Sequence, residues 1–256
     1  MTGPTNNYWV EGAPPAFYDC RSELKAAYPV TGQTYSAGAS LSQEGEDQWV
    51  HKRFFHADPP AGGGASKRRF IELGALDGRR FSNSYLYEKS LGWGGLLIEG
   101  STANYVDLEK NRAANPSVTC LHAGVCATPQ ILKMAGSGPM AAAPKGDGAP
   151  IPYSPSQKLS FAPCLPMRDL VSMAKIDRVD LYSIDVEGAE LAVIETHDFE
   201  AAPAFVLVIE MRPSDEPKNM SNAHVRQAAH DRGFCRFTNI MGHNNEVWLN
   251  EAYPYK

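Results

Sequence analysis

The sequence lacks several features that would assign the chain to a common class. No apolar run reaches the roughly 18 residues that a membrane-spanning helix needs, and the N-terminus has no basic flank followed by an apolar run. Basic residues are not in excess, because the formal net charge is -5, and this argues against a nucleic-acid-binding surface. We therefore expect a soluble chain, cytoplasmic or the lumenal part of a longer membrane-anchored protein, whose substrate is small or neutral.

Cysteine motifs are also absent. The five cysteines are Cys20, Cys120, Cys126, Cys164 and Cys235, and they form no C-x-x-C pair. Neither a zinc site nor a redox motif is therefore predicted. The pattern favours plain buried or surface thiols. A bridge between Cys120 and Cys126 stays open as an alternative, because their even spacing directs both side chains to one side of a strand.

The chain divides into an arm and one domain. Its 256 residues, with 43% hydrophobic content, suit a single large core. Residues 1–40 are rich in Pro, Gly, Tyr and Asn and are predicted to form an arm over the domain surface, which leaves 41–256 as the domain. Residues 41–55 predict a helix with an acidic first turn and an aromatic inner face.

From residue 69 onward, apolar runs alternate with helical patterns. Strands are predicted at 69–75, 93–101, 117–126, 179–188 and 204–212, and helices at 82–92, 102–115, 167–176, 189–199 and 222–233. Continuously apolar strands separated by helices indicate a parallel sheet covered on both faces. Two last strands, at 234–242 and 245–254, form a hairpin. The predicted fold is α/β and Rossmann-like, with a mostly parallel seven-stranded sheet and one antiparallel edge strand.

Residues 129–160 interrupt this rhythm with Pro, Gly, Ala and Ser. A structureless segment of this length is unusual in a compact domain, and such loops are commonly lids or disordered insertions. We interpret 129–160 as a loop insertion of one of these two kinds. Because it follows the third predicted strand, it is expected near the carboxyl edge of the sheet, where open α/β folds bind ligands.

Four of the five predicted parallel strands end in an acid. These acids are Glu72, Glu99, Asp185 and Glu210. One acid at a strand-to-helix junction is commonly a helix cap. Several carboxylates crowded into one crevice destabilise each other, however, unless a positive or hydrogen-bonding group lies among them. The pattern therefore predicts a ligand that carries positive charge.

The turn after the first strand indicates which ligand this is. Residues Gly74 to Gly78 lack the G-x-G-x-x-G spacing of a dinucleotide site, and Glu72 and Asp77 would repel a pyrophosphate. S-adenosylmethionine instead carries an ammonium and a sulfonium, which carboxylates attract. The two glycines allow close approach of the ligand to the backbone, and Glu99 is placed to accept both ribose hydroxyls.

Four spaced segments resemble the FkbM-type S-adenosylmethionine-dependent methyltransferases, a branch of the class I Rossmann-like methyltransferases. The segments are SQEGED at 42–47, ELGALDGRRFSNSYLYEKSLGWGGLLIEGS at 72–101, LYSIDVEGAELAVI at 181–194 and LVIE at 207–210. The resemblance covers about residues 41 to 250. It implies a class I fold, an S-adenosylmethionine site on the first three strand ends, and O-methylation of a hydroxyl on a sugar or a sugar-bearing product.

The resemblance also implies a set of cofactor-binding residues. By position, Glu72, Gly74, Asp77 and Gly78 form the cofactor turn, Ser82 and Asn83 contact the methionine end, Glu99 holds the ribose, His122, Ala123 and Gly124 edge the adenine, and Gln43 and Glu46 close over the site. The chain departs from the family pattern in the 129–160 insertion. It departs again in the GVCA segment after the third strand, where an acid is common.

Asp185 is the first candidate for the catalytic group, since it ends the fourth strand beneath the expected position of the transferred methyl group and would also contact the cofactor. It can act as a proton acceptor. Alternatively, Asp185 and Glu210 share a divalent metal such as magnesium, or Asp185 caps the next helix. Glu187 is interpreted as a helix-start residue. His243, in the turn before the last strand, is a further candidate base.

Three functions remain open at this stage. The first is an O-methyltransferase that acts on a hydroxyl of a small molecule or glycan. The second is a non-catalytic S-adenosylmethionine-binding or protein-interaction domain that keeps the fold. The third, a nicotinamide dehydrogenase, is disfavoured by the missing glycine fingerprint.

Overall fold

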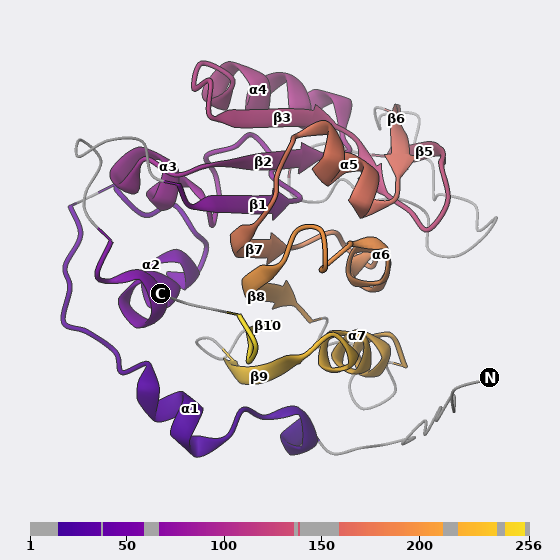
Figure 1. The fold of residues 1–256 in the computed structure, drawn as a ribbon. Coiled ribbons are helices and arrows are strands. Elements are labelled where there is room, and N and C mark those ends of the chain that lie inside the picture. Colours follow the sequence, from indigo (N-terminus) through magenta and orange to yellow (C-terminus); the bar gives the residue numbers. More distant parts are fainter. Residues whose placement is uncertain are drawn as a thin grey trace, which may run out of the picture.

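The computed structural model describes residues 15–36, 38–58, 67–135, 138, 159–211, 220–239 and 244–253. A seven-stranded sheet forms its centre (Figure 1). Its strands are β1 (Arg69–Leu73), β2 (Gly94–Glu99), β3 (Val118–His122), β7 (Val179–Ile184), β8 (Ala204–Glu210), β9 (Phe234–Asn239) and β10 (Asn245–Asn250). The helices around it are α2 (Glu46–Val50), α3 (Tyr85–Leu91), α4 (Thr102–Arg112), α5 (Met167–Met173), α6 (Glu190–Thr196) and α7 (Met220–Asp231).

The strand order is β3-β2-β1-β7-β8-β10-β9. The pairs among β3, β2, β1, β7 and β8 are parallel. Strand β10 runs antiparallel to both of its neighbours, β8 and β9. The predicted α/β fold, with a mostly parallel sheet and an antiparallel hairpin at one edge, is therefore confirmed.

Two apolar layers bury the faces of the sheet. Along β1, Ile71 packs in a cluster with residues of α5, α6 and α7, whereas its neighbour Phe70 packs in a second cluster with residues of α2, α3 and α4. This alternation follows from the period of two in a strand. Figure 1 shows α5, α6 and α7 together on one side of the sheet. The carboxyl ends of the parallel strands remain uncovered by these layers, and a ligand can approach there.

The predicted helix at 41–55 begins later than expected and changes its winding. Gly45, with φ +83°, precedes α2, so that the helix starts only at Glu46. After Val50 the helix continues as a π-helix, η2 (His51–Phe55). Before α2, Ser42 forms a parallel β-bridge with Phe81. This bridge brings the segment that contains Gln43 to the carboxyl edge of the sheet.

The ends of the 129–160 segment are not a loop, contrary to the sequence interpretation. Strand β5 (Gln130–Ala135) pairs antiparallel with β6 (Leu159–Leu165), and β6 pairs parallel with β4 (Gly124–Val125). Periodicity alone did not reveal β6, because Pro163 interrupts its short alternating pattern. The lid and disordered-insertion interpretations concern residues 136, 137 and 139–158, which lie outside the described part.

The expectation of plain thiols is wrong for four cysteines. Cys20 bonds to Cys235, and Cys126 bonds to Cys164. Cys120 is free and does not pair with Cys126, contrary to the alternative considered from spacing. The partners are 215 and 38 residues apart, so only the folded arrangement brings them together.

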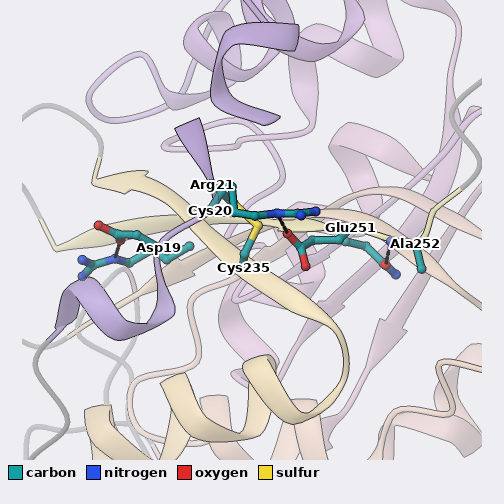
Figure 2. Close-up of a disulfide and its surroundings, with 8 residues drawn as sticks. Asp19, Cys20, Arg21, Cys235, Glu251 and Ala252 are labelled. Atoms are coloured by element: carbon teal, nitrogen blue, oxygen red, sulfur yellow. Dashed lines mark hydrogen bonds and ion pairs between the residues drawn. A yellow bond between two sulfur atoms is a disulfide. The ribbon is translucent and has the colours of Figure 1, made fainter. Parts of the chain in front are cut away.

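The first bridge attaches the N-terminal segment to the edge of the sheet (Figure 2). This segment contains η1 (Pro15–Tyr18) and α1 (Ser22–Ala27). Next to the bridge, the Cys20 N–H donates to the Arg236 carbonyl at 2.8 Å, and the Arg236 side chain pairs with Asp19 at 2.7 Å. The described part of the predicted arm is thus held against β9. Among the helices of the described ranges, none has the length and apolar character required to cross a bilayer.

Removing this bridge should destabilise the domain. The double variant Cys20→Ser/Cys235→Ser is expected to unfold with a free energy lower by about 2–4 kcal/mol, because the bridge closes a long chain loop in the unfolded state. Equilibrium denaturation with urea measures this change. Cys120→Ser, which removes a free thiol, is the control. Equal midpoints for the double variant and the oxidised wild type would contradict the expectation.

Candidate active site

One pocket opens where the parallel strands end. Gly74, Glu99, Ala123, Asp185 and Glu210, at or just after the ends of five different strands, all line it. The remaining lining residues are Gln43, Glu72, Leu73, Leu76, Arg80, Phe81, Asn83, Ile98, Gly100, Asn104, Gly124, Val125, Leu132, Met134, Gly138, Ser183, Val186, Glu187 and Ala189. The predicted crevice therefore exists, and it brings together most of the residues predicted for the site.

Gly74 allows two strand ends to approach closely. Its φ is +70°, and a Cβ atom at this position would lie 1.9 Å from the backbone oxygen of Asp185. No side chain fits in this space, and the left-handed conformation is strained for any residue other than glycine. The residue therefore sets the spacing between the ends of β1 and β7 at the floor of the pocket.

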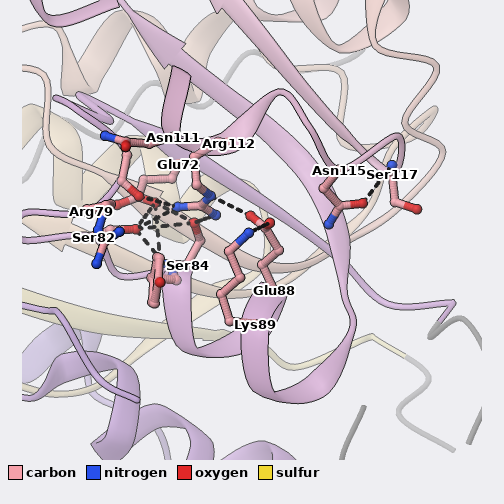
Figure 3. A network of polar contacts seen from close by, with 12 residues as sticks. Glu72, Arg79, Ser82, Ser84, Glu88, Lys89, Asn111, Arg112, Asn115 and Ser117 are labelled. Atoms are coloured by element: carbon pink, nitrogen blue, oxygen red, sulfur yellow. Dashed lines mark hydrogen bonds and ion pairs between the residues drawn. The ribbon is translucent and has the colours of Figure 1, made fainter. Parts of the chain in front are cut away.

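Glu72 is buried, and its carboxylate is occupied by the following loop. Its Oε1 accepts the N–H of Asn83 at 2.8 Å, and its Oε2 accepts the Ser82 hydroxyl at 2.9 Å and the Ser84 hydroxyl. Figure 3 shows Glu72 beside the two serines and the side chain of Arg112, which reaches in from α4. Glu72 lines the pocket, but its hydrogen bonds hold residues 82–84 in place rather than leaving the carboxylate free.

Asn83 presents an unused acceptor. Its Nδ2 donates to the Ser183 hydroxyl at 3.0 Å. Its Oδ1 is buried and has no hydrogen-bond partner within the described residues. A buried acceptor without a partner is costly unless a ligand supplies the donor. This atom is therefore suited to receive an N–H group from a bound molecule.

Glu99 ends β2 with both carboxylate oxygens engaged by backbone. Oε2 accepts the N–H of Leu76 at 2.8 Å, and Oε1 accepts the N–H of Ser101 at 2.7 Å. Burial raises the pKa of this carboxyl, although the hydrogen bonds from Ser101 and Leu76 oppose the shift. Oε1 also accepts a long hydrogen bond from Asn104 Nδ2 at 3.5 Å, whereas Oε2 keeps a second lone pair for a ligand hydroxyl.

The small three-stranded sheet forms an apolar wall of the pocket. Leu132 and Met134 of β5 face the glycines at the ends of β2 and β3, since a Cβ at Gly100 would lie 2.6 Å from the Met134 sulfur and one at Gly124 2.5 Å from the Leu132 side chain. Asn104 of α4 anchors the end of this wall. Its Oδ1 accepts the N–H of Gly138 at 2.7 Å, and its Nδ2 donates to the Gly138 carbonyl at 3.1 Å.

Five residues predicted to contact the cofactor lie outside the pocket lining: Glu46, Asp77, Gly78, Ser82 and His122. The first two use their carboxylates locally. Glu46 accepts from the Glu44 N–H at 2.9 Å and from the Asn245 amide at 2.9 Å. Asp77 accepts the N–H groups of Arg79 and Arg80 at 2.9 and 2.8 Å, and thus caps its own turn. The expected convergence of Asp77 with Glu72 and Glu99 on one hollow is therefore wrong.

The remaining three residues, Gly78, Ser82 and His122, make hydrogen bonds next to the pocket. The Gly78 carbonyl accepts Arg112 Nη1 at 2.6 Å, and the Ser82 hydroxyl accepts the N–H of Tyr85 at 3.2 Å. His122 turns toward α4, where its Nε2 lies 3.1 Å from the Gly100 carbonyl and its ring stacks on Tyr105. Gly78 and Ser82 thus support the turn after β1, and His122 packs against α4, none of them lining the pocket.

Three acids lie together at the ends of β7 and β8. Single oxygen atoms of Asp185, Glu187 and Glu210 all lie within 4.8 Å of one another. The pKa of the Asp185 carboxyl is raised well above its usual range, first by burial within the cleft and then by the charge of Glu210 and a hydrogen bond with it. The Asp185 side chain is nevertheless exposed where it lines the pocket, so a ligand can reach its carboxylate. The cluster can hold a proton or a divalent cation.

The helix-cap interpretations of these acids are not supported. Helix α6 begins at Glu190 with Ala189 before it, and no side chain caps it. Asp185 and Glu187 both precede that position and line the pocket. Glu187 has a left-handed backbone, with φ +54°, which is costly for a residue with a side chain. His243 lies outside the described residues.

The family follows from the sequence match. The family described as "Methyltransferase FkbM domain" matches residues 72–235, well over half of the chain. The chain belongs to the FkbM methyltransferase domain family. No curated protein matches this chain significantly.

Several solved structures resemble this FkbM domain at low identity. A methyltransferase FkbM from Methylobacillus flagellatus KT shares 12% identity, covers 79% of this chain and 50% of its own, and gives a TM-score of 0.38. An O-methyltransferase from Bacillus cereus in complex with SAH shares 12%, with coverages of 88% and 86% and a TM-score of 0.42. Aeropyrum pernix fibrillarin with bound S-adenosyl-L-methionine shares 11%, with coverages of 72% and 66% and a TM-score of 0.40. The match with this chain covers 50% of the FkbM structure's length and 66% of fibrillarin's.

Sequence reasoning missed several lining residues of this FkbM domain. Leu132 and Met134 were hidden because β5 was interpreted as loop. Leu76 and Phe81 have left-handed backbones, with φ +51° and +63°, and no sequence signal marks such residues when they are not glycine. Together with Glu187, three of the four non-glycine residues of this kind in the described ranges line the pocket. Strained backbone of this sort concentrates at functional sites.

Proposed function

We propose that this FkbM-family domain is an S-adenosylmethionine-dependent O-methyltransferase that acts on a hydroxyl of a small molecule, a sugar or glycan. The observation that carries the proposal is the position of Asp185. Its carboxylate, whose pKa is raised by burial and by Glu210, lies in the same pocket as the glycine floor at Gly74. This position supports a role for Asp185 as the proton acceptor next to the proposed methyl donor.

The pocket residues fit the donor chemically. The unpartnered Asn83 Oδ1 can accept the ammonium of the methionine end, and the fixed Glu99 carboxylate can accept a ribose diol. Gly74 lines the same pocket and lets the end of β1 approach Asp185 closely. The wall formed by Leu132 and Met134 suits a flat apolar base. S-adenosylmethionine, when bound, supplies a methyl group on a positively charged sulfur.

The acids at β7 and β8 then handle the proton of the acceptor. Asp185 accepts the proton that the acceptor hydroxyl loses, and Glu210 shares it through their hydrogen bond. The acid-rich lining favours a neutral acceptor with several hydroxyl groups over a nucleic acid or another polyanion. Carboxylates are good acceptors for such hydroxyls, which supports a sugar or glycan.

A metal-assisted variant of the same chemistry rests on the three clustered oxygens. Asp185, Glu187 and Glu210 offer the hard oxygen ligands that magnesium prefers. In that case the residues would bind the ion that lowers the pKa of the acceptor hydroxyl. Turnover assayed after dialysis against EDTA, with and without added magnesium, separates the two. Full activity without metal supports proton acceptance by Asp185 directly.

The proposal is tested by methyl transfer from isotopically labelled S-adenosylmethionine to a panel of free sugars, glycosides and small alcohols. The expected product is heavier than its acceptor by one CH2 group. The rival function, a non-catalytic binding domain, is favoured if S-adenosylhomocysteine binds but no acceptor gains a methyl group. A protein that binds neither S-adenosylmethionine nor S-adenosylhomocysteine would overturn the proposal.

Glu99→Gln should weaken binding of S-adenosylhomocysteine by roughly 10- to 100-fold, because the neutral amide keeps only one acceptor oxygen for the two ligand hydroxyls. Isothermal titration calorimetry measures this. Glu109→Gln, an exposed change on α4, is the control. Unchanged affinity in Glu99→Gln would remove the ribose assignment.

We also propose an oxidising compartment for the chain, such as the lumenal side of the secretory pathway. Two disulfides within one domain are typical of such compartments and rare in the cytosol. Mass spectrometry of alkylated protein from its native source tests this. Free thiols at Cys126 and Cys164 in that material would contradict it.

A further inference from the structure

The charges of the pocket lining are unevenly divided. Five acids line the pocket, namely Glu72, Glu99, Asp185, Glu187 and Glu210. Among the described lining residues, Arg80 alone is basic. The proposed methyl donor carries two cationic groups and one carboxylate. Acids can accommodate its ammonium, its sulfonium and its ribose, but they repel its carboxylate. The carboxylate therefore needs a partner of the opposite sign.

Arg80 lies close in the chain to Asn83, the residue suited to the ammonium of the donor, and can therefore serve the carboxylate at the same end. It lies in the loop after β1, three residues before Asn83, whose free Oδ1 suits the ammonium of the same amino-acid end. Its backbone N–H donates to the Asp77 carboxylate at 2.8 Å, which fixes the turn on which it sits. This gives Asp77 a supporting role in place of direct contact.

The Arg80 side chain is exposed and packs on the next residue. Its guanidinium lies 5.0 Å from the centroid of the Phe81 ring. It forms no ion pair with any residue in the described ranges. A guanidinium that stacks on an aromatic ring keeps its N–H edge free for a planar, two-oxygen acceptor. A carboxylate is such an acceptor.

Phe81 occupies its position at a cost. Its φ is +63°, and its side chain is 42% exposed. A left-handed backbone is disfavoured for a bulky residue, and exposure of an aromatic ring gives up burial. The parallel bridge to Ser42 holds this backbone in place. Such a costly arrangement is consistent with a functional demand on the ring, and support of the Arg80 guanidinium is such a demand.

We propose that Arg80, supported by Phe81, binds the carboxylate of the methyl donor. This inference rests on the proposed function and adds to it a residue for the one anionic group of the donor. The amino-acid end of the ligand is then recognised at both charged groups, the ammonium by Asn83 and the carboxylate by Arg80. The acids at β7 and β8 remain available for the acceptor.

Two ligands that differ by this group test the assignment. S-adenosylhomocysteine carries both the amine and the carboxylate, whereas S-adenosyl-3-thiopropylamine carries the amine but no carboxylate. Calorimetric titration of Arg80→Gln should show about ten-fold weaker binding of S-adenosylhomocysteine than wild type, since a charge-assisted contact is lost. Binding of the decarboxylated ligand should stay within two-fold, on the order of experimental scatter. Arg80→Lys keeps the charge and should lose less.

Arg79→Gln is the matched control. Arg79 is the adjacent exposed arginine, but it lies over the Tyr85 ring at 5.6 Å and does not line the pocket. Its replacement should leave both affinities unchanged. Both variants alter exposed side chains, and thermal unfolding should match wild type.

Other results would overturn the assignment. Equal weakening of both ligands in Arg80→Gln, or an unchanged affinity for S-adenosylhomocysteine, would refute a contact with the carboxylate. If Arg80→Gln raised only the KM for anionic acceptors, Arg80 would contact the acceptor, and the assignment to the donor's carboxylate would also be refuted. These results leave the proposed function intact. Failure of wild type to bind S-adenosylhomocysteine at all would overturn both proposals.

Discussion

Asp185→Asn should lower the rate of methyl transfer by about 10³-fold, because an amide keeps the shape of the side chain but cannot accept the proton. Binding of S-adenosylhomocysteine should stay close to that of wild type, since Gly74, Asn83 and Glu99 provide the proposed contacts to the donor. Single-turnover measurements with saturating donor, together with calorimetry, give the two quantities. Equal turnover in variant and wild type would remove the catalytic assignment.

The pH dependence of the reaction should report the same group. The pKa of Asp185 is raised by burial and by Glu210, and the proton acceptor must be ionised to act. Activity should therefore rise with pH through this raised pKa, so that the acidic limb lies above the range of an ordinary aspartate. Glu210→Gln removes the neighbouring charge and should move the limb to lower pH. A limb that stays in place would show that another group controls the rate.

The same shift has a consequence for stability. A carboxyl whose pKa is higher in the folded than in the unfolded state binds more protons when folded, so stability falls as pH rises from about 3.9 to the raised value. Above the raised pKa, the charged Asp185 therefore opposes folding. Asp185→Asn should consequently be at least as stable as wild type, and a loss of turnover would not reflect unfolding. Glu187→Gln, in the same cluster, is the control for a general effect of lost charge.

The strands were predictable because their residues carry a strong local signal. Buried on both faces, β1, β2, β7 and β8 are largely apolar, and each is followed by a helix. Acids at their ends were visible for the same reason, since polar residues interrupt an apolar run. The approach of Gly74 to Asp185, by contrast, joins positions more than 100 residues apart along the chain. The sequence shows a glycine at position 74, but it does not show that Asp185 lies against it.

The partners of charged side chains were much less predictable. Glu72 and Asp77 look alike in sequence, as acids beside a glycine turn. In the structure, however, Glu72 accepts hydrogen bonds from residues 82–84, whereas Asp77 accepts them within its own turn. A carboxylate near the pocket can serve the protein or the ligand, and only the positions of nearby N–H and O–H groups decide between them. The same holds for Arg112, which no sequence pattern marked.

Arg112, at the end of α4, anchors the loop that carries the residues proposed to bind the donor. Its side chain is fully buried, and Figure 3 shows it pointing toward Glu88 and the serines of the loop. Its Nε donates to Glu88, and its Nη1 donates to the Gly78 carbonyl at 2.6 Å. Its Nη2 donates to the Ser84 hydroxyl at 3.0 Å. One side chain of α4 thus joins both ends of the loop that carries Arg80 and Asn83.

Arg112→Met should therefore destabilise the domain by about 3–5 kcal/mol, because the buried Glu88 carboxylate then keeps only its contact with the partly exposed Lys89. The free energy of unfolding from urea denaturation measures this loss. Lys110→Met, on the same helix but exposed, should have little effect. Replacing both partners, in Glu88→Met/Arg112→Met, should recover part of the stability, since two apolar side chains leave no unpaired charge.

The double variant also separates stability from site geometry. Even where it folds stably, it lacks the hydrogen bonds to Gly78 and Ser84, so the loop at 78–84 is no longer held from α4. Affinity for S-adenosylhomocysteine should then remain below that of wild type, by roughly ten-fold for the loss of positioned contacts. Wild-type affinity in a stable double variant would show that Glu72 alone, through its contacts with residues 82–84, is sufficient to hold the donor loop.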